Sequence, residues 1–372
     1  MRFPITLTNP SLFSIKETAR SGRGVYADLP IVKGTLLLET PDIAGKVIYR
    51  EYRKEVCSQC FKYDRGREWK LRNAVTGVVF CSEACNANWS AEDESNDRVL
   101  STALAAIEAI GKSGKSKPVD IDEDQENGTS HRPTAAEISA AWDNAEETAI
   151  RIMAARNSER PTKADRRVLT QAMAAAPYRD VLAFFLTGTI CATLTPKLWS
   201  DVLELASDDE PYPSAFILHT HTTSYLHLLA SLPLYILPQI RPERLRSLAQ
   251  QSAHNAFNIW SQDLNLTPDS IGDTPDTEAG GAAGGSECLG YGVWPYASYF
   301  NHSCAPNVRK QRVGQTWKFS ADRDIVPGEE LCITYLGGDE KEMTKDDRLA
   351  RLRFNWGFVC GCARCSEGAV RV

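Results

Sequence analysis

The sequence lacks the apolar run of about 20 residues that a transmembrane helix needs, and its start, MRFPITLTNP, lacks the pattern of a signal peptide. It also lacks an excess of basic residues: 42 lysines and arginines are outnumbered by 48 aspartates and glutamates, so the net charge is −6. These absences argue against a membrane anchor and against electrostatic binding of nucleic acid. We therefore expect a protein of the nucleus or the cytoplasm, without a membrane or a direct nucleic-acid partner.

Internal repeats are absent as well, and the pattern changes along the chain. Short strand-like runs occur near both ends: RGVYADLP and GTLLLET, then YGVWPYASYF, TWKFSADRDI and ELCITYL. Between them a helical pattern runs from about Asp97 to about Trp260, interrupted by a polar stretch at 111–134. A Gly-rich linker follows at 261–286. The class is therefore α+β, and the two β-rich pieces could form one domain interrupted by an insert.

Cysteine, by contrast, is abundant. Eleven cysteines in a reducing compartment indicate metal ligands rather than a disulfide framework. Two close pairs, Cys57 with Cys60 and Cys81 with Cys85, are separated by twenty residues, which suits four thiolates around one tetrahedral zinc ion. A segment of this size is too short to hold a core unaided, so zinc would stabilise it. The alternative is four small buried residues in a reduced protein.

A second cluster, CGCARC, ends the chain with three cysteines in six residues, and a closed structural zinc site needs a fourth thiolate. The cluster consists of Cys360, Cys362 and Cys365, and the available partners are Cys191, Cys288, Cys304 and Cys332. Cys304 is the best candidate because Pro306 and the polar residues around it indicate a loop rather than a strand interior. Such a site would fold the tail back onto the loop YFNHSCAPNV.

Four motifs now stand in a fixed order: GRG at Gly22–Gly24, FNHSCAPN at Phe300–Asn307, ITY at Ile333–Tyr335, and the CxCxxC tail. Together they resemble the SET-domain protein lysine methyltransferases. A zinc module after the first strands, followed by helices, resembles the SMYD-type branch, whose insert is a MYND zinc finger. The resemblance covers most of the chain, apart from 111–134 and 262–286.

The resemblance implies S-adenosylmethionine as cofactor, two zinc ions, and a lysine-bearing protein, histone or non-histone, as substrate. It implies a SET-type β fold that is split by a zinc-finger insert and a mostly helical insert and ends in a zinc-bound tail. The expected order is a SET N-terminal part at 1–50, a finger at 51–98, a helical region at 99–260 with a flexible loop at 111–134, a linker at 261–286, a SET core at 287–340 and a post-SET tail at 341–372.

The finger departs from the family pattern. MYND fingers usually carry two interleaved zinc sites, but no second CxxC lies between Cys60 and Cys81, and Asp93 and Asp97 stand roughly where late ligands would be expected. We therefore expect one zinc ion in the finger, and its peptide-binding role is open. Because the sequence ends at Val372, we also expect no C-terminal helical-repeat domain.

Methyl transfer to lysine needs a neutral amine aligned behind the methyl group of a sulfonium donor. Free lysine titrates near pH 10.4, so only about one in a thousand is neutral at physiological pH. An apolar, aromatic-walled channel disfavours the ammonium form, and the reaction then depends mainly on alignment. By resemblance the catalytic residue is Tyr335, whose phenol orients the amine and polarises the site; the alternative is an ordinary strand-end tyrosine.

The resemblance also assigns residues to the cofactor and to the lysine channel. Glycines at 22 and 24 let the backbone approach the donor closely, and His302 contributes backbone groups. The cofactor-binding set is Gly22, Arg23, Gly24, Asn255, Asn301, His302 and Phe358, the last stacking on adenine unless it is a core residue of the tail. The channel set is Tyr299, Phe300 and Trp356. A core role is an equal alternative for the first two, and Trp356 replaces a tyrosine of many relatives, which leaves the degree of methylation open.

Two further features have simpler interpretations. His219, His221 and His227 in ILHTHTTSYLHLL suggest a metal site, but residues two apart on a helix do not share a face, so we expect partly buried histidines without a metal. The runner-up function is a SET and zinc-finger scaffold that binds a partner with little or no catalysis. We expect a monomer.

Overall fold

The computed structural model describes residues 12–18, 22–113, 131–174, 178–261, 287–337 and 339–366. Most of the two low-complexity stretches predicted as a flexible loop and a linker lies outside the described residues. The chain divides into two compact units. The strand-rich unit comprises Met1–Ile43, Glu55–Glu68 and Asn255–Val372, and the helical unit comprises Ala44–Lys54 and Trp69–His254.

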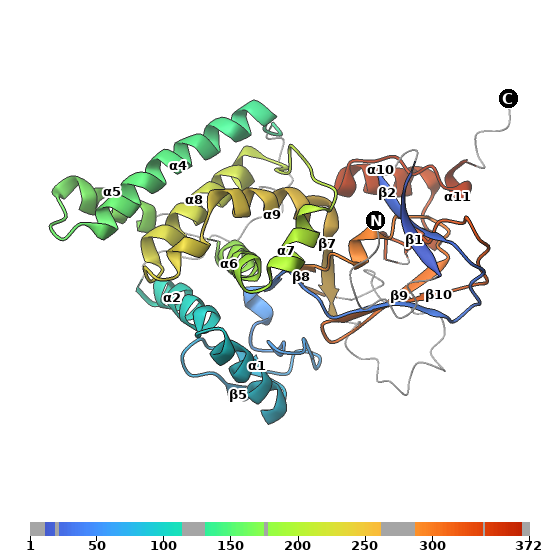
Figure 1. Cartoon of the computed structure of the whole chain (residues 1–372), viewed down its shortest axis with the longest axis horizontal. Coiled ribbons are helices and arrows are strands. Elements are labelled where there is room, and N and C mark those ends of the chain that lie inside the picture. The colour runs from blue at the N-terminus through green and yellow to red at the C-terminus, as the bar shows by residue number, and fades with distance from the viewer. Residues whose placement is uncertain are drawn as a thin grey trace. The chain divides into compact units, whose positions relative to one another are not determined.

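The strand-rich unit is built from short antiparallel pairs (Figure 1). Strand β1 (Phe13–Glu17) pairs with β2 (Arg23–Ala27), and β7 (Ala256–Trp260) pairs with β8 (Cys288–Val293). Strand β10 (Thr316–Ala321) lies between β3 (Leu36–Thr40) and β9 (Val308–Val313). Since β3 and β10 come from opposite ends of the chain, the two β-rich pieces form one unit. The predicted α+β class is confirmed.

Aromatic side chains fill the core beneath these strands. Trp294 and Trp317 are fully buried, and their rings meet edge to face at 6.1 Å. Trp294 donates its indole hydrogen to the Gln315 carbonyl at 2.8 Å. Phe300 stacks on Phe319, with ring centroids 4.6 Å apart. This packing fixes the end of the segment that leads from β8 into the FNHSCAPN loop.

The C-terminal part of this unit contains two short 3-10 turns, η5 (Ala297–Tyr299) and η6 (Asp339–Lys341), and two helices, α10 (Lys345–Trp356) and α11 (Ala363–Ser366). The Thr344 side chain caps α10 by accepting from the Asp347 amide at 3.2 Å. Gly357, with φ of +72°, ends α10 in the left-handed conformation that favours glycine. The chain turns there toward Phe358 and the terminal cysteines.

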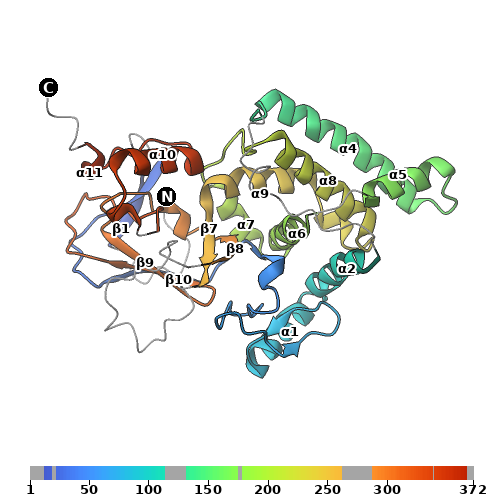
Figure 2. The same ribbon diagram turned by 180° about the vertical axis from the view of Figure 1, so that it is seen from behind.

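The helical unit has short strands at its start: β4 (Gly45–Ile48), the turn η1 (Arg50–Tyr52), β5 (Leu71–Arg72) and β6 (Val79–Phe80). Its helices are α1 (Glu83–Ser95), α2 (Val99–Ser113), α4 (Ala135–Asn157), α5 (Lys163–Ala174), α6 (Arg179–Leu194), α7 (Pro196–Leu203), α8 (Ala215–Ser231) and α9 (Pro242–Asn255), with a 3-10 turn, η2 (Leu237–Gln239). Both views show α4 and α8 side by side (Figures 1 and 2). Of the three histidines on α8, His219 is exposed, His221 is partly buried and His227 is buried.

The structure differs from the sequence prediction at three places. The helical pattern was expected to reach Trp260, but α9 ends at Asn255 and the next five residues form β7. The run ELCITYL forms no named strand; two isolated bridges join Glu330 to Tyr26 and Ile333 to His302. Helix α2 extends to Ser113, into the stretch predicted to be flexible. Within the described residues, no single helix is long and apolar enough to span a membrane. Helices α6 and α7 meet these two criteria only when they are taken together, as a pair bent by 116°.

Candidate active site and metal clusters

The NHS and ITY motifs lie side by side in the strand-rich unit. His302 and Ile333 form a parallel bridge, and the Ser303 amide donates to the Ile333 carbonyl at 2.9 Å. The Ile333 amide donates to the Asn301 carbonyl, also at 2.9 Å. These backbone bonds bring Asn301 and His302 close to Tyr335, although some thirty residues separate the motifs in the sequence.

The GRG strand joins the same site through the Asn301 side chain. Its amide nitrogen donates to the Arg23 carbonyl at 3.0 Å and to Glu330 Oε1 at 2.8 Å. A Cβ placed on Gly24 would lie 2.4 Å from Glu330 Oε1 and 2.7 Å from Asn301 Nδ2, so any side chain here would have to displace both of these groups. Among the described residues, no donor reaches the Asn301 amide oxygen, which leaves an acceptor available to a ligand.

Tyr335 is fixed at both ends. Its backbone amide donates to His302 Nδ1 at 3.0 Å, and its hydroxyl donates to the Phe300 carbonyl at 3.1 Å. Burial, with smaller contributions from Cys332 and Glu330, raises the pKa of the Tyr335 phenol, so it stays protonated at neutral pH. The Trp356 ring lies 5.4 Å from the Tyr335 ring, and the Phe358 ring lies 6.4 Å from it, edge on. The ITY motif and the tail thus form an aromatic corner around one phenol.

The remaining residues predicted for the site take varied positions. The Arg23 guanidinium lies 5.4 Å above the Tyr299 ring, and Phe300 is buried on Phe319, which fits the core alternative for its ring. Gly22 has a φ of +68° and open space around it. Asn255 is buried at the end of α9, and its carbonyl accepts from the Ser298 hydroxyl at 3.1 Å. The described contacts of Asn255 do not include Asn301 or Tyr335.

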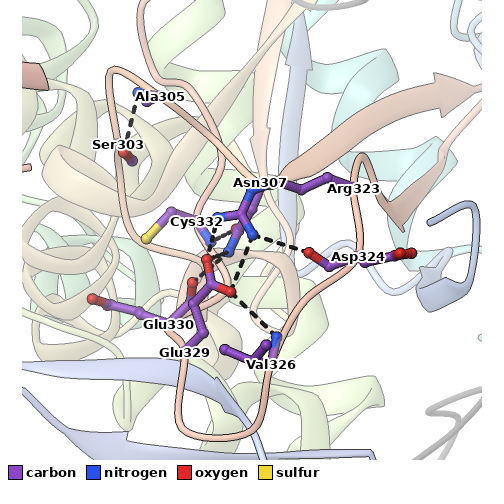
Figure 3. A network of polar contacts seen from close by, with 9 residues as sticks. All are labelled: Ser303, Ala305, Asn307, Arg323, Asp324, Val326, Glu329, Glu330 and Cys332. Carbon is purple, nitrogen blue, oxygen red and sulfur yellow. Dashed lines mark hydrogen bonds and ion pairs between the residues drawn. The ribbon is translucent and has the colours of Figure 1, made fainter. Parts of the chain in front are cut away.

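Sequence reasoning missed two polar residues that hold the site, Glu330 and Asn307. Asn307 is almost fully buried, donates to the Glu330 carbonyl at 2.8 Å and accepts from the Cys332 amide at 2.8 Å (Figure 3). It also donates to Glu329, which pairs with Arg323; that pairing, ahead of other causes, lowers the pKa of the Glu329 carboxyl. The adjacent acidic pair in GEEL and the asparagine that closes FNHSCAPN were the available signals.

The C-terminal thiols form the group that the sequence predicted. Cys304, Cys360, Cys362 and Cys365 have sulfur atoms that all lie within 4.8 Å of one another. Cys304 Sγ is 3.9 Å from Cys360 Sγ and 3.5 Å from Cys365 Sγ. Four thiolates at 2.3 Å from one zinc ion stand about 3.8 Å apart, whereas a disulfide would require about 2 Å. The donor set and its spacing therefore fit a closed structural metal site.

Nearby groups adapt this cluster to a cation. Burial, followed by the neighbouring Cys360 thiol, raises the pKa of Cys304, so a bound metal ion would have to displace the proton of this thiol. Arg348 is buried, and its Nη2 lies 3.8 Å from Cys365 Sγ. The Arg364 guanidinium donates to the Cys304 carbonyl at 3.2 Å. The two cations offset the negative charge that four thiolates would bring.

The first cysteine cluster is also a compact group of thiols. The sulfur atoms of Cys57, Cys60, Cys81 and Cys85 lie within 4.8 Å of one another, and those of the last two are 3.6 Å apart. Asp93 and Asp97, the other ligands considered, do not belong to this group among the described residues. Asp93 is buried and accepts from the Ser101 amide at 3.0 Å, which ties α1 to α2. The described part of the finger therefore offers one metal site.

Comparisons with known proteins agree with this geometry. The model of the SET domain family matches residues 22–336. The "Potential protein lysine methyltransferase SET6" of Saccharomyces cerevisiae is 27% identical over 388 residues, which cover 95% of each chain. The "Histone-lysine N-methyltransferase SET5" of Yarrowia lipolytica is 50% identical over 72 residues, 19% of this chain and 16% of that one. The human "Protein-lysine N-trimethyltransferase SMYD5" is 39% identical over 80 residues, 21% of this chain and 19% of its own.

Proposed function

Because the chain belongs to the SET-domain family, we propose that it is an S-adenosylmethionine-dependent protein-lysine N-methyltransferase. The observation that carries the proposal is the convergence of Gly24, Asn301 and Tyr335 on one site. The full-length similarity to a protein named as a potential lysine methyltransferase supports the same reaction.

The cofactor would be held where the GRG strand meets Asn301. A glycine with no room for a Cβ lets the backbone approach a ligand closely, and the free amide oxygen of Asn301 can accept a hydrogen bond from it. Phe358 offers an aromatic face beside His302, at 6.1 Å between ring centroids. When bound, S-adenosylmethionine supplies a methyl group on a sulfonium centre that a neutral amine can attack.

The chain's own residues would align and desolvate the substrate amine. Tyr335 keeps its proton and a fixed orientation, so its phenol oxygen is a preorganised dipole beside the transfer path. The aromatic wall of Tyr335 and Trp356 disfavours an ammonium ion and so favours the neutral amine. Tyr299 would belong to the same channel, while the buried ring of Phe300 would support it from the core.

Zinc is the proposed metal of both cysteine clusters, because four thiolates at tetrahedral spacing are a preferred structural zinc site. The proposed substrate is a lysine of a histone or of another protein, and the proposed location is the nucleus or the cytoplasm. The acidic balance of the chain suits a basic polypeptide better than a nucleic acid.

The direct test is transfer of a labelled methyl group from S-adenosylmethionine to proteins of an extract that lacks the enzyme. We expect labelling by the wild type and a loss of about 100-fold or more in Tyr335→Phe, which removes one oriented dipole. Tyr235→Phe is the matched control, since this tyrosine is 57% exposed in the helical unit.

Calorimetry with S-adenosylmethionine separates the enzyme from a scaffold. Cofactor binding that persists in Tyr335→Phe, with transfer lost, supports the assigned role. Equal transfer by Tyr335→Phe and the wild type would remove that role from Tyr335. A wild type that binds no S-adenosylmethionine and transfers no label would instead be a SET and zinc-finger scaffold.

A further inference from the structure

The imidazole of His302 contacts two separate parts of the site. It lies between the C-terminal cysteine cluster and the backbone of Tyr335. The resemblance to the family assigned only backbone groups of this residue, whereas its ring makes two contacts of its own, to Cys304 Sγ and to the Tyr335 amide. The side chain therefore has a separate task.

The hydrogen bonds fix the tautomer of the His302 ring. The donor at Nδ1 is the Tyr335 amide, at 3.0 Å, and an amide can only donate. Nδ1 must therefore be the unprotonated nitrogen, so the ring hydrogen is on Nε2. Nε2 lies 3.3 Å from Cys304 Sγ, and its hydrogen can be donated to that sulfur.

A hydrogen bond to a ligating sulfur is typical of the groups around a metal site that orient the ligands and tune the metal. Cys304 is the one member of its cluster that lies far from the tail in the sequence, 56 residues before Cys360. A hydrogen bond from His302 would fix the position of this sulfur relative to the NHS loop. The same ring, by accepting from Tyr335, would fix the point at which the ITY segment turns away.

We propose that His302 is a positioning residue that couples the C-terminal metal cluster to Tyr335, with one ring nitrogen serving each partner. The statement about Tyr335 as a catalytic group rests on the proposed function, whereas the coupling itself does not. Two kinds of variant at His302 test its two contacts separately, the one with Cys304 Sγ and the one with the Tyr335 amide. Asparagine can place an oxygen near the position of Nδ1 and keep an acceptor for the Tyr335 amide; glutamine can reach the position of Nε2 and keep a donor to sulfur.

The experiment measures zinc release to a chromogenic chelator and amide hydrogen exchange of Tyr335 in the full chain. We expect His302→Asn to weaken retention of one zinc ion by about tenfold or more, while the Tyr335 amide stays protected. We expect His302→Gln to retain zinc, to raise exchange at the Tyr335 amide about tenfold and to lower kcat. His219→Asn and His219→Gln, at an exposed histidine, should change neither quantity.

A second pair of variants tests the coupling with His302 intact. Cys365→Ser removes a proposed metal ligand with which His302 has no described contact. We expect this variant to raise hydrogen exchange at the Tyr335 amide. The control Cys85→Ser, in the other cysteine cluster, should leave that exchange unchanged. The proposal is overturned if Cys365→Ser leaves that amide protected, or if the two His302 variants change zinc release and exchange to the same extent. Zinc release and exchange are measured without any substrate, so a failure of the methyltransferase assignment would not alter them.

Discussion

At residue 24 the site depends on the absence of a Cβ atom. The backbone of Gly24 passes so close to Asn301 and Glu330 that a Cβ would lie 2.7 Å from one and 2.4 Å from the other. Contacts of this kind force neighbouring groups to move, and here the neighbours hold each other by a 2.8 Å hydrogen bond. The requirement for glycine thus comes from space, with no positive φ involved.

We therefore expect Gly24→Ala to weaken S-adenosylmethionine binding by about tenfold or more, because the added methyl group displaces the Asn301 amide. Isothermal calorimetry measures this, and thermal unfolding checks that the variant folds. Gly45→Ala is the control: a Cβ there would meet its nearest neighbour, Phe184, at an ordinary 3.4 Å. Equal loss of cofactor binding in both variants would contradict a local role for Gly24.

Residue identity alone predicted part of this site. The sequence indicated Gly24, Asn301 and Tyr335 because each belongs to a short motif. It did not indicate Glu330, whose carboxylate accepts from Asn301 and also raises the pKa of Tyr26, after the larger effect of burial. Its role depends on a pairing between β2 and the segment around Glu330, and nothing in the local pattern specifies that pairing.

At the scale of elements, the strands with a clear apolar pattern were predictable. RGVYADLP, GTLLLET and TWKFSADRDI form β2, β3 and β10. AFNIW follows α9 without a break, and the sequence pattern predicts a helix there, but pairing with β8 makes it a strand. Tertiary contacts therefore overrode a helical pattern where five residues carry too little local information.

Helix α10 brings a charge to the C-terminal cysteine cluster. Arg348 is buried there, with Nη1 on the Met343 carbonyl at 2.8 Å and Nη2 near Cys365 Sγ. Four thiolates leave a zinc site with net negative charge, which a buried guanidinium offsets. The helix thus contributes to metal binding although it supplies no ligand.

We expect Arg348→Gln to speed release of one zinc ion about tenfold, as loss of a group beside the ligands generally does. Arg353→Gln on the same helix is the matched control, since Arg353 is exposed. Zinc release to a chelator measures the effect, and total zinc per chain shows whether one ion or both are affected. If the two variants released zinc at the same rate, Arg348 would have no part in the cluster.

At the scale of the whole molecule, the main topological fact is that one strand-rich unit is assembled from distant segments. Strand β3 pairs with β10 across more than 270 residues, and the helical unit intervenes in sequence. The sequence allowed this arrangement without requiring it, because strand patterns do not specify partners. The order of four motifs, through its resemblance to a family, supplied the missing long-range information.

We expect the stability of the chain to decrease as the pH falls, because of two histidines in the helical unit. The Nδ1 atom of His221 is buried and has no hydrogen-bond partner among the described residues, and the ring meets Phe185 at 4.8 Å and Tyr212 at 5.2 Å, both edge on. Burial lowers the pKa of His221 to about 4 from 6.5. Burial also lowers the pKa of His227.

Because the folded pKa is the lower one, the unfolded chain binds the proton first as the pH falls. The contribution of His221 to stability is therefore full above pH 6.5 and is lost progressively down to about pH 4, on the order of 3 kcal/mol in total. Thermal unfolding between pH 7.5 and 4.5 should show a falling midpoint for the helical unit. His221→Phe, which keeps an aromatic ring in the same place, should fall less steeply, while His219→Phe at an exposed position should follow the wild type. Parallel curves for His221→Phe and the wild type would show that the acid sensitivity comes from other groups.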